Sequence, residues 1–543
     1  MQLKIRSRVK VLVVIGGLLC VAALVFGVVQ KSRDAFKQVR PRRVSAPGSP
    51  SSSSKLIRAG GNLQAELNAA APGDTITLEA GAKFTGPFIL PNKPGKGGET
   101  EWITIQSSQV SQLPVDVRVS PEKAVAMPKI IAGAGQPAIK TNGAAHHYKF
   151  IGIEIITNES GDAPYNLIEL GDDGGSGQTT LDKVPHHFVF DRCYIHARDG
   201  QDAPRGFGLN SSDTEITNSY IANFKSKRTD SQTILAWNTP GRFKIINNYL
   251  EAATETLQFG GGGGCAPLTQ QGILPSDIEV RRNRLTKRLE WRGVWLVKNL
   301  FEIKYARRVT VDGNLMENNW ADGQVGFAVQ LTVRNEGGVC NLNTIEDVTF
   351  TNNLVQHSSA AINLLGTDAP RQAGQGKRIT IRNNLFFDLD SDKYGGASAF
   401  LQTIGADTVT VDHNTALFAI AIAIQNGQPT TRLTYTNNIA SQGIIGCGGP
   451  GNDTIKNCLP GTSIKRNIFY NDSVHEPEYG NYPVDNWYPD TLAELGLINI
   501  TGGDFKLANT SRYKGRATDG KDPGCDLDLL RTATAGTISG IWR

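Results

Sequence analysis

Two stretches of the chain, Val348-Thr-Phe-Thr-Asn-Asn353 and Ile379-Thr-Ile-Arg-Asn-Asn384, carry the pattern on which the fold prediction depends. Apolar and polar residues alternate along each stretch, and each stretch ends in two asparagines. A period of two residues is expected for a strand that buries one face. Ten endings of this kind, each an asparagine pair or a close variant, occur at Arg192-Cys193, Asn218-Ser219, Asn247-Asn248, Arg282-Asn283, Gly313-Asn314, Asn352-Asn353, Asn383-Asn384, His413-Asn414, Asn437-Asn438 and Arg466-Asn467.

The spacing of these pairs indicates a repeat. Their second members lie between 24 and 39 residues apart. A repeat of about 20–50 residues is typical of a solenoid, and each repeat here has room for about three short strands with almost no helical periodicity. A propeller blade is longer, about 40–45 residues, and has a sheet signature of its own. The sequence therefore predicts an all-β fold, a right-handed parallel β-helix.

The asparagines themselves have two interpretations, a polar binding strip or a structural ladder. Asparagine tolerates the left-handed backbone region and caps turns through its side-chain amide, which every corner of such a coil requires. We therefore expect the asparagines to stack from coil to coil and to bond to the backbone.

The pairs resemble the repeats of the right-handed parallel β-helix proteins, the superfamily of pectate lyases, polygalacturonases, alginate lyases and phage tailspikes. The resemblance covers roughly residues 60–540 and implies this scaffold and a carbohydrate-facing role. The chain lacks the Asn-Thr-Asp and Gly-His-Gly elements of polygalacturonases, and also the Arg-x-Pro-x-x-Arg and Trp-x-Asp-His elements of pectate lyases. A fold hosts many functions, so the activity has to be argued from the site.

The N-terminal part of the chain predicts export. Residues 1–10 are basic, and the apolar run at 11–29 is long enough to span a bilayer. We predict a transmembrane or signal-anchor helix there, with a cleavable signal peptide as the alternative. A basic Pro/Ser-rich linker follows at 30–55. The body is then expected in the periplasm or outside a bacterial cell, either anchored to the membrane or secreted after cleavage.

The body is predicted to consist of the β-helix at 56–470 and a C-terminal cap at 471–543. A short helical pattern from Leu63 to Ala71 precedes the first coils. The first coil of a solenoid exposes its apolar interior and its strand edges. We therefore expect this segment to form a helix that caps the open end.

Charge and cysteines exclude several classes of function. The formal charge is +5, but residues 1–55 hold 11 of the 56 basic and 1 of the 51 acidic residues, so the remainder carries 45 basic and 50 acidic residues. A mildly acidic body lacks the clustered basic residues that nucleic-acid binding requires. We also expect the protein to be a monomer. Cys447 and Cys458 are candidate disulfide partners, and Cys193 is expected to be buried. The spacing of Cys and His predicts no zinc site.

The charged and aromatic residues of the middle coils, between 198 and 335, suggest where chemistry takes place. Residues of successive coils stack about 4.8 Å apart, so positions some thirty residues apart can build one groove. Carboxylates, cations and indole rings in one groove suit a polysaccharide. The predicted roles are catalytic for Lys298 and Arg334, substrate-binding for Arg205, Trp237, Trp320 and Glu302, and calcium-binding for Asp230, Glu255 and Asp322.

The predicted reaction is β-elimination of a uronic-acid polysaccharide. It requires a group that neutralises the uronate carboxylate, either Ca²⁺ or a cation, and a base whose pKa is shifted toward the working pH. Lys298 or Arg334 beside two or more acidic groups would favour this lyase. Clustered carboxylates without a cation would favour a glycoside hydrolase, and scattered charges would favour a non-catalytic glycan-binding solenoid. Leu296 and Leu300 are each two residues from Lys298, so the alternation of a strand would place the Lys298 side chain on the same, apolar face.

Overall fold

The computed structural model describes residues 54–93, 102–172, 177–369, 371–425, 427–472 and 481–541. The predicted anchor at 11–29 and most of the linker at 30–55 lie outside these residues. Within the described ranges, no helix has both the length and the apolar character that crossing a membrane requires.

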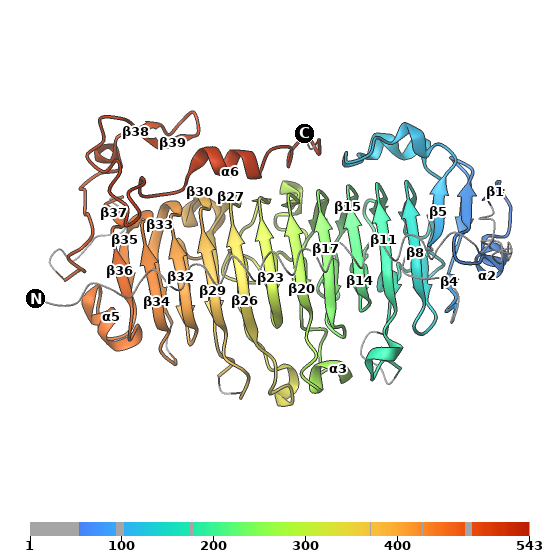
Figure 1. Cartoon of the computed structure of the whole chain (residues 1–543), viewed down its shortest axis with the longest axis horizontal. Coiled ribbons are helices and arrows are strands. Elements are labelled where there is room, and N and C mark those ends of the chain that lie inside the picture. The colour runs from blue at the N-terminus through green and yellow to red at the C-terminus, as the bar shows by residue number, and fades with distance from the viewer. Residues whose placement is uncertain are drawn as a thin grey trace, which may run out of the picture. The chain divides into compact units, whose positions relative to one another are not determined.

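Three rows of parallel strands form the body (Figure 1). Row A is a 14-stranded sheet. Its strands are β1 (Ser54–Ile57), β2 (Thr75–Leu78), β5 (Ile103–Ser107), β8 (His146–Ile151), β11 (His186–Asp191), β14 (Ser212–Thr217), β17 (Gly241–Ile246), β20 (Ser276–Arg281), β23 (Ala306–Asp312), β26 (Ile345–Thr351), β29 (Lys377–Arg382), β32 (Asp407–Asp412), β34 (Thr431–Thr436) and β36 (Ser463–Lys465).

The other two rows belong to a 23-stranded sheet, because the long strand β33 pairs in both. Row B contains β3 (Lys83–Thr85), β6 (Lys129–Ile131), β9 (Glu154–Ile156), β12 (Tyr194–His196), β15 (Tyr220–Phe224), β18 (Tyr249–Ala252), β21 (Arg284–Thr286), β24 (Leu315–Glu317), β27 (Leu354–Ser358), β30 (Leu385–Leu389), β33 (Thr415–Ile424), β35 (Ile439–Ile445) and β37 (Ile468–Tyr470). Row C contains β4 (Phe88–Leu90), β7 (Ile139–Thr141), β10 (Asn166–Leu170), β13 (Arg205–Leu209), β16 (Gln232–Ala236), β19 (Glu255–Phe259), β22 (Asn299–Ile303), β25 (Phe327–Thr332), β28 (Ala360–Leu365) and β31 (Ala399–Ile404).

Each strand pairs in parallel with the strand one coil away, as β20 does with β23 and β22 with β25. This is the strand order of a parallel β-helix, so the predicted scaffold is confirmed. The chain is a parallel β-helix protein. Its right-handed winding stays a prediction from the general handedness of parallel crossovers.

The asparagine pairs make the corner between row A and row B. The first member adopts the left-handed region, with φ of 54° at Asn352 and 65° at Gly313. The second member is buried and forms a ladder: the Oδ1 of Asn353 accepts from the backbone N–H of Asn314 at 2.9 Å and from its Nδ2 at 2.9 Å. The same bond to a backbone N–H recurs from Asn248 to Asn438, so the structural interpretation of the asparagines is confirmed.

A second ladder, of alternating charge, runs along row A. Near the start of the strands from β14 to β29, one register position is held in turn by Asp213, Arg242, Asp277, Arg308, Asp347 and Arg378. Each arginine pairs with the aspartate of the preceding coil, as Arg308 Nε does with Asp277 Oδ1 at 2.6 Å. Surface ion pairs of this kind stabilise weakly, so the ladder mainly fixes the register of the coils.

The interior is one hydrophobic cluster that follows the whole solenoid. Its aromatic rings stack at the coil spacing, as Phe150 and Phe190 do with centroids 4.9 Å apart. Helix α2 (Leu63–Ala69) begins after the N-cap Asn62 and buries Leu63 and Leu67 in the same cluster. A helix therefore packs onto the first coils, as predicted.

The other helices are short and lie outside the rows. They are α3 (Pro267–Gln270), α4 (Ser391–Tyr394), α5 (Asn452–Cys458) and α6 (Leu527–Ala533). The strands β38 (Leu497–Asn499) and β39 (Asp504–Leu507) form the one antiparallel pair of the described sheets.

The C-terminal segment, residues 515–541, runs back along the solenoid toward its first coils, with α6 lying over the strands (Figure 1). Its backbone bonds first to Asn437 and then to Asn383, and near its end Gly540 O accepts from Arg118 N at 2.9 Å. At Gly313 a Cβ would come within 2.5 Å of the carbonyl oxygen of Ala533. This contact explains why glycine replaces asparagine in that pair.

Within the described residues, two disulfides link loops. The predicted Cys447–Cys458 bond is present, and a second bond joins Cys265 to Cys340 across 75 residues. Cys193 is a free, buried cysteine, as predicted.

Candidate functional site

Lys298 lies between two carboxylates, at the start of row C strand β22. Its Nζ is 2.6 Å from Asp230 Oδ1 and 3.2 Å from Glu255 Oε1. The Glu255 side chain is 2% exposed, whereas that of Asp230 is 40% exposed. Burial alone would lower the pKa of Lys298, but Glu255 and Asp230 together raise it above its ordinary value. Lys298 is therefore a fixed ammonium that solvent reaches from the Asp230 side.

Glu255 belongs to a row of hydrogen-bonded polar side chains that crosses four coils. Gln232 Nε2 donates to Glu255 Oε2 at 2.8 Å, and Arg205 Nε donates to Gln232 Oε1 at 2.8 Å. Arg205 Nη1 also donates to Asn166 Oδ1 at 3.0 Å. These residues are all at the first position of their row C strands, so the register of the coils aligns them. The row holds two opposite charges, Arg205 and Glu255, on either side of a neutral amide.

Glu302 is the acidic group in this cluster with the most altered pKa. It is 3% exposed, and its Oε2 accepts from Asn299 Nδ2 at 3.0 Å. Burial, and then the nearby charge of Glu255, raise the pKa of Glu302 to about 7. A carboxyl group with this pKa changes its protonation near neutral pH, as a general base or acid must.

Two further lysines surround the carboxylates. Lys304 Nζ is 3.4 Å from Glu336 Oε1. Burial lowers the pKa of Lys304, but the charges of Glu302 and Glu336 outweigh burial and raise it above its ordinary value. Lys287 is fully enclosed, and its Nζ donates to the carbonyls of Ala252, Ala253 and Thr254 at 3.1, 2.8 and 2.8 Å. Burial lowers the pKa of Lys287 to about 7 against the attraction of Glu255. Lys287 holds a corner together, whereas Lys298 and Lys304 lie near the surface.

Arg334, the second predicted catalytic residue, lies beside the end of β22 that is farther from Lys298. Its backbone N–H donates to Lys304 O at 3.1 Å, and its Nη1 is 3.4 Å from Asp368 Oδ1. Lys298 precedes β22 and Lys304 follows it, so at about 3.3 Å per residue the two ends are roughly 20 Å apart along the backbone. The structure therefore brings Asp230, Glu255 and Glu302 to Lys298, and it places Arg334 apart from them.

Both predicted aromatic residues, Trp237 and Trp320, are buried, with 3% of each exposed, and they differ in their neighbours. The Arg205 guanidinium lies 5.2 Å from the Trp237 ring centroid and 4.9 Å from that of Tyr165. Tyr165 is 51% exposed and was not singled out from the sequence. Trp320 is 3% exposed and packs in a hydrophobic cluster with Trp291 and Val297. A sugar could stack on Trp320 only if the surrounding loops moved.

Asp322, the third predicted calcium ligand, bonds to backbone. Its Oδ2 accepts from Val297 N at 3.0 Å. Asp230 and Glu255 already share the Lys298 ammonium. The calcium role of these three acids stays a prediction.

Sequence reasoning also missed a line of amides on row C. Gln402 donates to Asn363 at 2.8 Å, and Asn363 donates to Gln330 at 2.7 Å. Gln330 and Asn299 both donate to Gln324 Oε1, at 3.1 Å each. The signal was a polar residue at the same position of successive row C strands, in register with Glu302. All of these amides except Gln324 are buried, and they continue the hydrogen-bonded polar side chains of row C away from the charged cluster.

Two clefts of about 530 and 510 Å³ lie over row A instead, and Lys149, Val189 and Glu215 line both. The Lys298 cluster lines neither of them. We place the candidate site at Lys298 because the buried acids, the altered pKa of Glu302 and the cations gather there.

Comparisons with known proteins give a likeness in fold. No family model matches the chain, and no curated protein matches it by sequence. Among solved structures, the catalytic unit of a GH87 alpha-1,3-glucanase from Streptomyces thermodiastaticus strain HF3-3 is 14% identical with a TM-score of 0.46, covering 82% of this chain and 69% of its own. The PL6 family alginate lyase AlyGC is 13% identical (TM-score 0.45; 88% and 57% covered), and pectate lyase Pel9A is 11% identical (TM-score 0.37; 87% and 96% covered). With every TM-score below 0.5, these likenesses carry no argument about activity.

Proposed function

We propose that this protein acts on a polysaccharide that contains uronic acid, and that it cleaves the chain by β-elimination at the Lys298 cluster of row C. The apolar run at 11–29 supports the further proposal that it does so outside the cytoplasm, anchored or secreted.

The observation that carries the proposal is the position of Lys298 between Asp230 and Glu255. A cation beside two acids provides both charges that elimination requires: a positive group for the uronate carboxylate and carboxylates that can hold a proton or a metal ion. Asp230 is the exposed partner. A uronate carboxylate can therefore replace Asp230 on the Lys298 ammonium without uncovering Glu255.

The proposed step uses Glu302 as the base, because its pKa of about 7 lets it lose and regain a proton at working pH. Glu302 is 3% exposed, so the proposed step requires a movement that uncovers it. Glu302 then takes the proton from the carbon next to the uronate carboxylate. The electron pair of that C–H bond forms the new carbon–carbon double bond, and the bond to the glycosidic oxygen breaks. The leaving oxygen takes a proton from water. Lys298 neutralises the carboxylate throughout. The neighbouring sugar binds on the exposed ring of Tyr165, against which the buried guanidinium of Arg205 packs at 4.9 Å.

The test is the ultraviolet absorbance of the unsaturated uronate product, measured with the full-length protein on a panel of uronic-acid polymers. We expect Lys298→Met to lower kcat/KM by about 100- to 1000-fold, as loss of a charge-stabilising donor does. The matched control is Lys244→Met. Lys244 is a row A lysine that pairs with Glu215 at 2.7 Å. It should leave the rate unchanged.

Other outcomes of the same experiment would overturn the proposal. Loss of activity in Lys244→Met but not in Lys298→Met would move the site to row A. If Lys298→Met does not fold, Asp230→Asn, at a half-exposed position, replaces it and should alter KM. Loss of activity in chelator would support the calcium prediction for Asp230, Glu255 and Asp322.

A hydrolase is the second candidate, for one reason. The Asp230 and Glu255 oxygens both contact Lys298 Nζ, at 2.6 and 3.2 Å, so they lie within about 6 Å of each other, near the carboxylate separation of retaining glycosidases. New reducing ends without an unsaturated product would favour it. Neither product on any polymer would favour a glycan-binding solenoid.

A further inference from the structure

Two pairs of adjacent histidines occupy the same position in consecutive coils of row A. His146-His147 begins β8 and His186-His187 begins β11, and His146 stands in register with His186. The rings stack from coil to coil, with centroids 4.9 Å apart for His146 and His186 and 4.5 Å apart for His147 and His187. Four imidazoles thus meet on a row that does not contain the Lys298 cluster.

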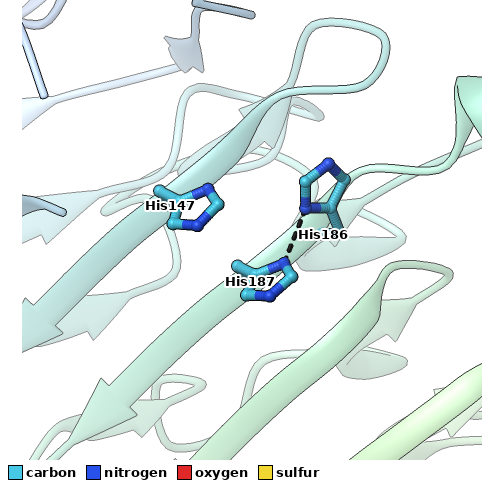
Figure 2. A group of neighbouring side chains, drawn as sticks. All are labelled: His147, His186 and His187. Atoms are coloured by element: carbon cyan, nitrogen blue, oxygen red, sulfur yellow. Dashed lines mark hydrogen bonds between the residues drawn. The ribbon is translucent and has the colours of Figure 1, made fainter. Parts of the chain in front are cut away.

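The backbone explains how neighbours in sequence come together. His147 and His187 have φ of 61° and 60°, the left-handed region, which turns each side chain toward that of the preceding residue. The Nδ1 atoms within each pair are consequently 2.7 Å apart. Figure 2 shows the rings of His147, His186 and His187 gathered on the two strands, with the contact between His186 and His187 dashed.

The ring nitrogens of His147, His186 and His187 can be chosen so that all lie within 4.8 Å of one another. Tetrahedral Zn²⁺ binds imidazole nitrogen at about 2.0–2.1 Å, which places neighbouring ligand atoms roughly 3.4 Å apart. Side-chain movements of about an ångström would therefore bring the three ring nitrogens to the spacing of a tetrahedral site. Imidazole is a ligand that zinc, copper and nickel ions prefer.

An unsatisfied nitrogen points to a ligand. His147 is 9% exposed, and its Nε2 is buried without a hydrogen-bond partner. A neutral imidazole has one donor and one acceptor, so whichever way the proton between His146 and His147 is assigned, one polar atom of His147 is left without a partner. A buried group in that state costs about 1–3 kcal/mol. A metal ion bound at this nitrogen would remove the cost.

The surroundings leave room for a further ligand. Asp213 Oδ2 is 4.0 Å from His187 Nδ1, but Asp213 is already paired with Arg242. The Trp102 ring covers His147 with its centroid 5.1 Å away. The cleft of about 510 Å³ over row A is lined by His187, Asp213 and Trp102. Solvent or a small anion can thus reach a metal ion from the His187 side.

We propose that His147, His186 and His187 form a three-imidazole site for a divalent late transition metal ion of the zinc class, with the fourth position open to solvent. Sequence spacing predicted no zinc site, and it gives no signal for this one because the proposed ligands come from two coils 40 residues apart. The site does not depend on the proposed lyase activity.

The experiment uses Co²⁺ as a spectroscopic probe and Zn²⁺ as a competitor on the full-length protein, stripped with chelator and dialysed. We expect one Co²⁺ per chain, with the intense visible absorption of a tetrahedral nitrogen site, and its displacement by one equivalent of Zn²⁺. His147→Asn and His187→Asn should weaken binding at least 10-fold. Asparagine suits these positions because it tolerates the left-handed region.

His357→Asn is the matched control, since His357 has φ of 55° and bonds to Asp388 at 2.6 Å on row B. It should bind Co²⁺ like the unchanged protein. The proposal is overturned if the stripped protein binds no Co²⁺, if His147→Asn and His187→Asn bind it as tightly as the unchanged protein, or if the spectrum is that of an octahedral surface site. Circular dichroism of each variant separates loss of the site from loss of the fold.

Discussion

Replacing Glu302 by glutamine should stabilise the folded protein at alkaline pH. Burial and the charge of Glu255 raise the pKa of Glu302 from 4.5 to about 7. Because this pKa is higher in the folded chain than in the unfolded chain, the folded protein holds an extra proton between these two values. The free energy of unfolding therefore falls as the pH rises from 4.5 through about 7.

The magnitude follows from the pKa difference. A pKa of about 7 in place of 4.5 corresponds to roughly 3 kcal/mol at pH 8, at about 1.4 kcal/mol for each pH unit. Glutamine keeps the shape and an acceptor for Asn299 Nδ2, which now bonds to Glu302 at 3.0 Å. Glu302→Gln should thus gain on the order of 3 kcal/mol over the unchanged protein at pH 8 and almost nothing at pH 4.

The assay is urea unfolding of both proteins, followed by fluorescence at several pH values between 4 and 8. Glu215→Gln is the control, because Glu215 forms an exposed ion pair with Lys244 at 2.7 Å. That variant should lose about 1 kcal/mol or less at pH 8. A stability gain for Glu302→Gln that does not change with pH, or a loss at pH 8, would refute the reasoning. If Glu302 is also the base, the same variant is more stable and inactive, a combination that simple unfolding cannot produce.

Two further predictions concern the scaffold. Asn353→Ala removes the acceptor of two bonds from Asn314 and a donor to Val311 O, and should lower the free energy of unfolding by about 4 kcal/mol. Asn352→Gly keeps the left-handed backbone at φ of 54° but removes the half-buried bonds to Asp312 and from Asn383, and should cost less, about 1–2 kcal/mol. Equal urea midpoints for the two variants would contradict the ladder. Replacing Cys265 and Cys340 together by serine should lower the free energy of unfolding by about 2–5 kcal/mol and speed hydrogen exchange in the 260–264 loop. Unchanged exchange there would show that the disulfide does not order this loop.

The repeat was predictable because one local requirement recurs at every corner. The first residue of each pair has to take φ near 55°, and the second has to bridge coils through its amide. Only a few residue types meet these requirements, so the pairs are visible in the sequence. The ladder goes on to Asn486, which accepts from Asn467 Nδ2 at 2.9 Å. That rung was not apparent because Asn486 follows Asn467 by 19 residues, less than any earlier spacing.

The site was predictable only in part, since contacts between coils depend on loop lengths. The alternation of Leu296, Lys298 and Leu300 predicted that the Lys298 side chain lies on the apolar face. Lys298 precedes β22, however, and strand alternation does not apply there. Its pairing with Asp230, 68 residues earlier, depends on the register of three coils. The burial of Trp320 by Trp291 and Val297 is likewise a loop–loop contact with no local signal.

The measurement that tests the central claim most directly is the mass of the products released from a uronic-acid polymer in ¹⁸O-labelled water. Elimination at the Lys298 cluster breaks the glycosidic bond without adding water, so we expect unsaturated oligosaccharides, each lighter by one water than the hydrolysis product and free of the label at the new end. They should be missing when Lys298→Met is used and present with Lys244→Met. Saturated products that carry ¹⁸O would contradict the account and assign the cluster to hydrolysis.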